Sequence, residues 1–210
     1  MIKAVIFDFD GVIVDSYEAT IFYMQKTLRH FNKKAPAKKD FDKFLGLKAR
    51  DIIKGLLPNI EEKELEKMYE YSKEESVKAV PHIVLIDGAR DVLEQLSNSY
   101  KLGVVSSRGK QTLDILLDKF NLRDYFKSVI SREDVEHHKP HPESLLKALF
   151  QLKTKAEETV YIGDMEEDIL AAKAASVVSI FIKRKGKGNY NADYTVKNIT
   201  EIPKLLDEKI

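Results

Sequence analysis

The sequence predicts an α/β fold, a doubly wound parallel sheet with an inserted all-helical domain. Short, continuous runs of apolar residues alternate with stretches whose apolar residues recur at helical spacing. This alternation is typical of βαβ units, which build parallel sheets with helices on both faces. One long stretch, residues 16–81, breaks the alternation because it contains helical patterns and no convincing strand.

Apolar runs rich in β-branched and aromatic residues predict the strands. Such runs are expected where a strand is buried on both faces of a parallel sheet. The principal runs are Ala4–Phe7, Leu102–Val105, Thr159–Ile162 and Val177–Ile182. Two weaker candidates are Lys127–Ile130 and Asp193–Val196.

Apolar residues three and four positions apart predict the helices between these strands. The expected stripes are Ala89, Val92, Leu93 and Leu96; Leu113, Leu116, Leu117 and Phe120; Leu145, Leu146, Leu149 and Phe150; and Ile202, Leu205 and Leu206. Similar spacing recurs in the inserted stretch, which Pro81 closes. We therefore expect residues 1–15 and 82–210 to form the sheet domain and residues 16–81 to form a separate helical domain.

Composition excludes several classes of protein. The chain has no cysteine, which rules out disulfide frameworks, thiol nucleophiles, cysteine-ligated zinc and iron–sulfur clusters. With 35 basic and 34 acidic residues, its net charge of +1 does not favour nucleic acid as a partner. No apolar stretch reaches the roughly 18 residues of a membrane span. We expect a soluble, cytoplasmic protein without membrane contact.

Polar residues gather at one predicted edge of the sheet. In open parallel sheets, ligands bind beyond the carboxyl ends of the strands. The residues expected there after the strands are Asp8, Asp10 and Gly11 after the first, Ser106, Ser107 and Arg108 after the second, and Asp164 and Asp168 after Thr159–Ile162. Lys139 is expected there too, at the start of the helix that leads into Thr159–Ile162. Converging carboxylates repel one another, so this edge needs a cation. All the plausible ligands are oxygens, which favours Mg²⁺.

This set of residues fits phosphoryl transfer. A carboxylate such as Asp8 can act as a covalent nucleophile and form an aspartyl-phosphate. A second carboxylate, Asp10, can protonate the leaving oxygen and later deprotonate the attacking water. Gly11 lets the backbone approach a phosphate, while Ser106 and Lys139 can contact the phosphoryl oxygens.

Four segments in this order resemble the motifs of the haloacid dehalogenase superfamily. They are DFDGVIVDS, the serines that close VVSS, KPHP, and GDMEEDILAAKAA. The helical stretch directly after the first segment resembles the phosphatase branch with an inserted helical cap, to which phosphoglycolate phosphatases, β-phosphoglucomutases and pyrophosphatases belong. The resemblance covers about residues 3–183. It implies a Rossmann-like core, a cap formed by residues 16–81, and Mg²⁺-dependent hydrolysis of phosphoric monoesters in small phosphorylated metabolites.

Carried over by position, the resemblance implies catalytic and metal-binding roles. Asp8 would be the nucleophile and Asp10 the general acid/base, which also offers its backbone carbonyl to Mg²⁺. Ser106 and Lys139 would bind the phosphoryl group. The metal set would be Asp8, Asp10, Asp164 and Asp168, with Asp168 acting directly or through water.

The substrate-binding candidates are Gly11, Ser107, Arg108, Lys48 and Arg50. Arg108 has the alternative of capping the helix that follows it. Lys48 and Arg50 lie in a basic segment of the cap, Lys26–Lys54, whose charge suits an anionic substrate or, more simply, a solvated helix face.

Other functions remain open at this level. A sugar phosphomutase is one, although the stretch SYEATIFYMQ lacks the histidine that mutase relatives usually carry there. An inorganic pyrophosphatase is another, because a basic cap suits a compact anion. A non-catalytic phosphate-sensing protein is a third. His137, His138 and His141 flank Lys139, and we interpret them as polar loop residues rather than metal ligands.

Overall fold

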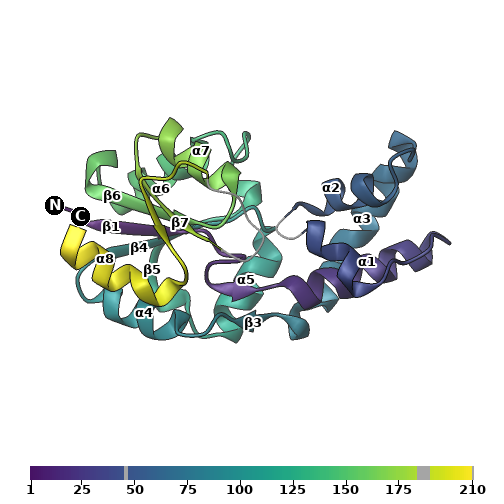
Figure 1. Ribbon diagram of the computed structural model, residues 1–210, viewed down its shortest axis with the longest axis horizontal. Helices are drawn as coiled ribbons and strands as arrows, with labels where there is room; N and C mark the ends of the chain where they lie inside the picture. The colour runs from purple at the N-terminus through teal and green to yellow at the C-terminus, as the bar shows by residue number, and fades with distance from the viewer. Residues whose placement is uncertain (45–46, 184–189, 210) are drawn as a thin grey trace. The chain divides into compact units, whose positions relative to one another are not determined.

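The computed structural model describes residues 1–44, 47–183 and 190–209. The chain divides into two compact units (Figure 1). Unit 1 comprises Met1–Val14 and Leu85–Ile210, and unit 2 comprises Asp15–Val84. The chain passes between them at two short strands that pair with each other, β2 (Val14–Asp15) and β3 (Val84–Leu85), which the apolar runs did not predict.

Unit 1 contains a parallel six-stranded sheet in the order β5-β4-β1-β6-β7-β8. Its strands are β1 (Ala4–Phe7), β4 (Lys101–Val105), β5 (Phe126–Ile130), β6 (Thr159–Gly163), β7 (Val178–Ile182) and β8 (Tyr194–Val196). The chain winds outward on both sides of β1, whose four residues are fully buried. The predicted doubly wound parallel sheet is confirmed, including its two weaker strands.

Helices cover both faces of this sheet. They are α4 (Ala89–Ser97), α5 (Lys110–Lys119), α6 (Glu143–Leu152), α7 (Glu166–Ala174) and α8 (Ile202–Lys209). Figure 1 shows α6 and α7 on one side of the sheet, and α4 and α8 on the other. On the first side, Leu145, Leu149 and Ala171 join Ile6 and Tyr161 in one apolar cluster.

The helix α6 differs from expectation in two respects. It begins at Glu143, so Lys139 and Pro140 lie in the preceding loop. A residue that precedes proline is disfavoured in helical conformation, which explains the later start. Leu146 and Phe150, expected in the apolar stripe, are instead 50% and 85% exposed. The buried face follows Leu145, Leu149 and Leu152, and its neighbours at 146 and 150 point away from the sheet.

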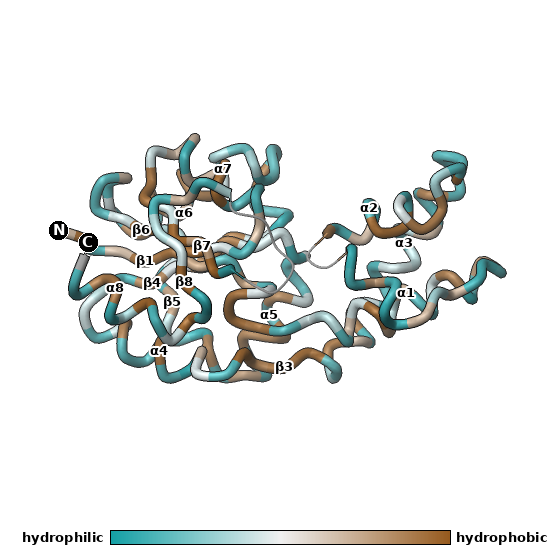
Figure 2. Tube along the Cα trace, in the orientation of Figure 1, coloured by the Kyte–Doolittle hydropathy of each residue, from teal (hydrophilic) through white to brown (hydrophobic). Residues whose placement is uncertain are grey.

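Unit 2 consists mainly of helices, and its bounds, Asp15–Val84, lie close to the expected residues 16–81. Its α-helices are α1 (Tyr17–His30), α2 (Ala49–Leu56) and α3 (Glu62–Lys78), with 3₁₀ segments at Lys38–Phe44 and Val80–His82. Both α1 and α2 pack on α3, and Met24, Leu28, Ile52, Leu65 and Met68 are buried in the resulting core. Figure 2 shows hydrophobic and hydrophilic residues alternating along these helices. Across both units, none of the helices within the described ranges has the length and apolar character of a membrane span.

Candidate active site

Strand register places the candidate residues at one level of the sheet. Phe7, the last residue of β1, pairs with Val104 of β4 and with Ile162 of β6. The backbone N–H of Asp8 donates to the carbonyl of Ile162 at 2.8 Å, which continues the sheet hydrogen bonding by one residue. Asp8, Ser106 and Asp164 therefore leave three neighbouring strands at the same edge.

The ammonium group of Lys139 joins two carboxylates in the interior. Its Nζ donates to Asp8 Oδ1 at 2.7 Å and to Asp168 Oδ1 at 2.6 Å. The side chains of all three residues are less than a tenth exposed. Such charge-assisted hydrogen bonds between buried groups are strong and fix their partners in position. The loop before α6 thus delivers Lys139 into the site that the sheet edge forms.

Asp168 also organises the start of α7. Its Oδ2 accepts from the backbone N–H of Asp164 at 3.2 Å and of Met165 at 3.0 Å. These bonds satisfy N–H groups at the beginning of a helix, as a cap does. A Cβ atom at Gly163 would lie 2.3 Å from the Cβ of Asp168, so glycine is what permits this approach. Asp168 therefore caps the start of α7 with one carboxylate oxygen and contacts Lys139 with the other.

Tyr161 belongs to the same cluster, although the sequence did not single it out. Its hydroxyl donates to Asp168 Oδ1 at 2.9 Å and accepts from Lys139 Nζ at 3.0 Å. Tyr161 is completely buried in the middle of β6. The available signal was a tyrosine in the middle of a buried and mostly apolar strand, because a buried tyrosine hydroxyl normally has a polar partner.

Replacing Tyr161 by phenylalanine should weaken this cluster without unfolding the protein. Lys139 and Asp168 keep their mutual ion pair, so we expect a loss of about 1–2 kcal/mol in the free energy of unfolding. Urea denaturation measures this loss. Tyr100→Phe, at a half-buried residue just before β4, serves as the control and should stay within about 0.5 kcal/mol of the wild type. Equal stability of the two variants would contradict the importance of the Tyr161 hydroxyl.

Asp10 and Arg108 form a second, more exposed pair beside this cluster. Arg108 Nε donates to Asp10 Oδ2 at 2.9 Å, and Arg108 Nη2 donates to the other carboxylate oxygen, Oδ1. The Arg108 backbone N–H donates to Ser106 Oγ at 3.1 Å. The side chain of Arg108 therefore orients Asp10, whereas Gly109, not Arg108, stands at the cap position of α5. Ser107 lies between these residues and is half-buried.

Gly11 turns the chain away from the cluster in a conformation that other residues rarely adopt. Its φ is +86°, and an added Cβ would lie 2.4 Å from Asp164 Oδ2. We expect Gly11→Ala to cost about 1–3 kcal/mol in unfolding free energy from backbone strain and to displace the Asp164 carboxylate. Thermal unfolding with and without Mg²⁺ measures both effects, since a displaced carboxylate also reduces the stabilisation by the ion.

Gly109→Ala provides a matched comparison for that variant. Gly109 has an ordinary φ of −63°, and the atoms nearest to its added Cβ belong to the flexible side chains of Arg132 and Glu133. Its stability and its response to Mg²⁺ should match those of the wild type. A Gly11→Ala variant that matched the wild type in both respects would contradict the strain argument.

Burial and neighbouring charges control protonation within the cluster. Burial raises the pKa of the Asp8 carboxyl well above its usual range, and the attraction of Lys139 offsets only part of this. Burial alone would lower the pKa of Lys139, but the carboxylates of Asp168 and Asp8 outweigh it and raise that pKa well above normal. Lys139 is therefore a permanent positive charge at the site.

The donor set at this edge fits a hard cation. Carboxylate oxygens of Asp8, Asp164 and Asp168 lie within 4.8 Å of one another, and all three residues are buried. One ammonium from Lys139 balances only part of their charge. Oxygen ligands without sulfur or imidazole match the preference of Mg²⁺. Within the described chain, these residues are consistent with a magnesium site.

Lys48 and Arg50, the two substrate-binding candidates of the inserted stretch, belong to unit 2. Lys48 is exposed and immediately precedes α2. The guanidinium group of Arg50 forms ion pairs with Glu62 and Glu66 of α3, so its charge is engaged inside this unit. Their roles in substrate binding stay predictions.

Comparison with known proteins agrees with this geometry. A family model for haloacid dehalogenase-like hydrolases matches residues 5–182. A curated relative, the pyrophosphatase PpaX of Anoxybacillus flavithermus, is 28% identical over 210 residues, which cover 98% of this chain and 97% of the relative.

Solved structures share the whole fold. The crystal structure of a haloacid dehalogenase-superfamily hydrolase from Geobacter sulfurreducens has a TM-score of 0.78 and 30% identity, covering 98% of this chain and 96% of that one. A predicted phosphoglycolate phosphatase from Haemophilus somnus has a TM-score of 0.82 at 19% identity, covering 98% of each chain. On the extent of the family match and the arrangement of Asp8, Lys139, Asp164 and Asp168, this chain belongs to the haloacid dehalogenase-like hydrolases.

Proposed function

We propose that this hydrolase is a Mg²⁺-dependent phosphatase that acts on a small phosphorylated compound through an aspartyl-phosphate on Asp8. The observation that supports this best is the environment of Asp8. Its carboxylate is buried, contacts the ammonium of Lys139 at 2.7 Å, and lies within 4.8 Å of carboxylate oxygens of Asp164 and Asp168. A nucleophilic carboxylate needs such positive charge nearby if an anionic phosphoryl group is to approach.

The proposed reaction has two steps, formation and hydrolysis of the aspartyl-phosphate. In the first, an Asp8 oxygen forms a bond to phosphorus while the bond to the leaving oxygen breaks, and the Asp10 carboxyl gives that oxygen its proton. In the second, a water molecule attacks phosphorus and gives a proton to the Asp10 carboxylate. The bond to Asp8 then breaks and inorganic phosphate leaves. Arg108 orients Asp10 for both proton transfers.

Three groups stabilise the phosphoryl oxygens during these steps. Lys139 holds a positive charge beside Asp8, and Ser106 offers a hydroxyl from the neighbouring strand end. Asp8 and Asp164, with the backbone carbonyl of Asp10, would hold Mg²⁺, and Asp168 would support them. When bound, the ion supplies positive charge that offsets the repulsion between the carboxylates and the phosphoryl group.

Unit 2 would act as the cap that selects the substrate in this proposal. Its basic residues include Lys48, which is exposed, and Arg50, which is half-buried. The pyrophosphatase name of the curated relative supports inorganic pyrophosphate as a second candidate substrate. Both substrates are cleaved at a phosphorus–oxygen bond, so the same Asp8 chemistry serves either one.

A substrate panel tests this proposal. The purified chain should release inorganic phosphate from an aryl phosphate and from selected phosphorylated metabolites in the presence of Mg²⁺. EDTA should abolish the release, and added Mg²⁺ should restore it. A higher kcat/KM for pyrophosphate than for any monoester would identify a pyrophosphatase.

Two outcomes would overturn the phosphatase proposal. Formation of an isomeric sugar phosphate without release of free phosphate would identify a mutase. Binding of phosphate or beryllofluoride without turnover of any compound on the panel would indicate a phosphate-sensing protein.

A further inference from the structure

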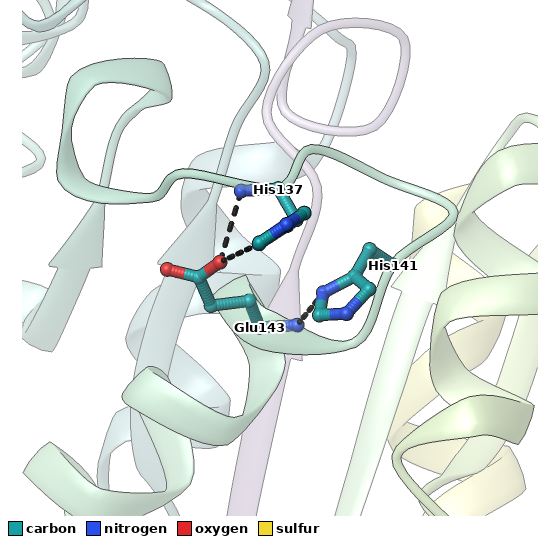
Figure 3. A group of neighbouring side chains, drawn as sticks. All are labelled: His137, His141 and Glu143. Atoms are coloured by element: carbon teal, nitrogen blue, oxygen red, sulfur yellow. Dashed lines mark hydrogen bonds and ion pairs between the residues drawn. The ribbon is translucent and has the colours of Figure 1, made fainter.

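Two of the three histidines that flank Lys139 come together with Glu143, the first residue of α6 (Figure 3). His137 Nδ1 lies 3.1 Å from Glu143 Oε2, and the Glu143 backbone N–H donates to His141 Nδ1 at 3.3 Å. The two imidazole rings have centroids 4.6 Å apart. One ligand atom from each of the three residues lies within 4.8 Å of the other two.

This geometry changes the interpretation of His137 and His141 as polar loop residues alone. We propose that they form a second metal site with Glu143, which takes a divalent transition-metal ion such as Zn²⁺. Two imidazoles and one carboxylate, completed by water, are a donor set that zinc uses, whereas Mg²⁺ prefers oxygen ligands alone. Zinc bonds of about 2.0 Å set tetrahedral ligand atoms about 3.3 Å apart. The separation of 3.1 Å between His137 and Glu143 is close to this value.

The carboxylate of this site is already ionised and held in place. Hydrogen bonds from the backbone of His137, from Lys147 and from the backbone of Glu136 lower the pKa of Glu143 to about 2. Lys147 and Glu136 both contact Oε1, at 3.0 and 3.1 Å, whereas His137 contacts Oε2. A metal ion at Oε2 would therefore leave the contacts of Oε1 unchanged. Both rings are exposed, so an ion can enter from solvent.

The position of this site relates it to the loop that carries Lys139. His137 precedes Lys139 by two residues and His141 follows it by two. An ion bound to both rings and to Glu143 would link the two sides of the loop to the start of α6. Bound metal should therefore restrict local opening of residues 136–143, which amide hydrogen exchange reports.

Zinc binding in excess Mg²⁺ tests the site, because Mg²⁺ then competes for the aspartate cluster. The wild type should bind one Zn²⁺ per chain in calorimetric titration, and exchange of the 136–143 amides should slow. His137→Ala and His141→Ala should each weaken binding at least tenfold. His138→Ala removes the exposed neighbouring histidine outside the cluster and should bind like the wild type.

Two further measurements separate this site from the aspartate cluster. Asp164→Asn, which alters the aspartate cluster, should still bind this Zn²⁺ with unchanged affinity. His137→Ala and His141→Ala should retain phosphate release, so the result is independent of the proposed phosphatase activity. The zinc site would be refuted if the double variant His137→Ala/His141→Ala bound Zn²⁺ like the wild type, or if His138→Ala weakened binding equally.

Discussion

Replacing Asp8 by asparagine is expected to abolish phosphate release while leaving the protein folded. Asparagine has nearly the same shape but cannot form a stable acyl-phosphate, so the covalent route is lost. Removal of a covalent nucleophile typically costs on the order of 10⁴-fold to 10⁶-fold in kcat. Release of inorganic phosphate from an aryl phosphate measures the loss. A short reaction with substrate labelled in its phosphoryl group, stopped by acid, should trap phosphoprotein only in the wild type.

The folded state of Asp8→Asn needs its own measurement. The substitution removes one of the carboxylates that lie close to Asp164 and Asp168, but it also removes a partner of Lys139. Circular dichroism and the cooperativity of thermal unfolding should match those of the wild type. Full activity in a folded Asp8→Asn protein would contradict the assignment of Asp8 as the nucleophile.

Replacing Lys139 by methionine is expected to lower the free energy of unfolding far more than replacing an exposed lysine does. Methionine fills a similar volume but leaves Asp8 and Asp168 buried without their shared cation. Breaking a buried ion pair by removing one partner costs about 3–5 kcal/mol. Urea denaturation measures the loss in free energy, and phosphate release should fall with it because the phosphoryl oxygens lose their positive partner.

Two controls make the Lys139 result specific. Lys204→Met removes a lysine whose side chain is 78% exposed and pairs with Glu208, so it should change stability by less than about 0.5 kcal/mol. Added Mg²⁺ should raise the free energy of unfolding of Lys139→Met more than that of the wild type, because the ion would replace the missing positive charge. Equal stability of the two variants without Mg²⁺ would contradict the ion pair seen in the structure.

The sheet could be predicted because its signals are local. The principal strands are apolar runs, and α4, α5, α6 and α8 each carry an apolar stripe, so these elements needed no long-range information. No such stripe marks α7. The exposure of Leu146 and Phe150 was not predictable in this way. Helical spacing identifies an apolar surface, but only the packing of α6 on β4 and β5 decides which residues face the sheet.

The candidate site was predictable to the extent that strand ends define it. Asp8, Ser106 and Asp164 follow strands, so topology alone places them at one edge. The partners of Tyr161 were not predictable, because an apolar run does not reveal where its hydroxyl points. The approach of His137 and His141 to Glu143 likewise depends on the path of a loop, for which periodicity carries no information.

The bonds of Lys139 also have a consequence for folding. The contact between Lys139 and Asp8 joins positions 131 residues apart in sequence, and the contact with Asp168 spans another 29. Contacts between such distant segments require most of the chain to be ordered first. During synthesis, Asp8 leaves the ribosome long before Lys139 and Asp168 do. The cluster of Asp8, Lys139 and Asp168 can therefore form only after most of the chain has been made, and a growing or truncated chain that lacks β6 and α7 cannot form it.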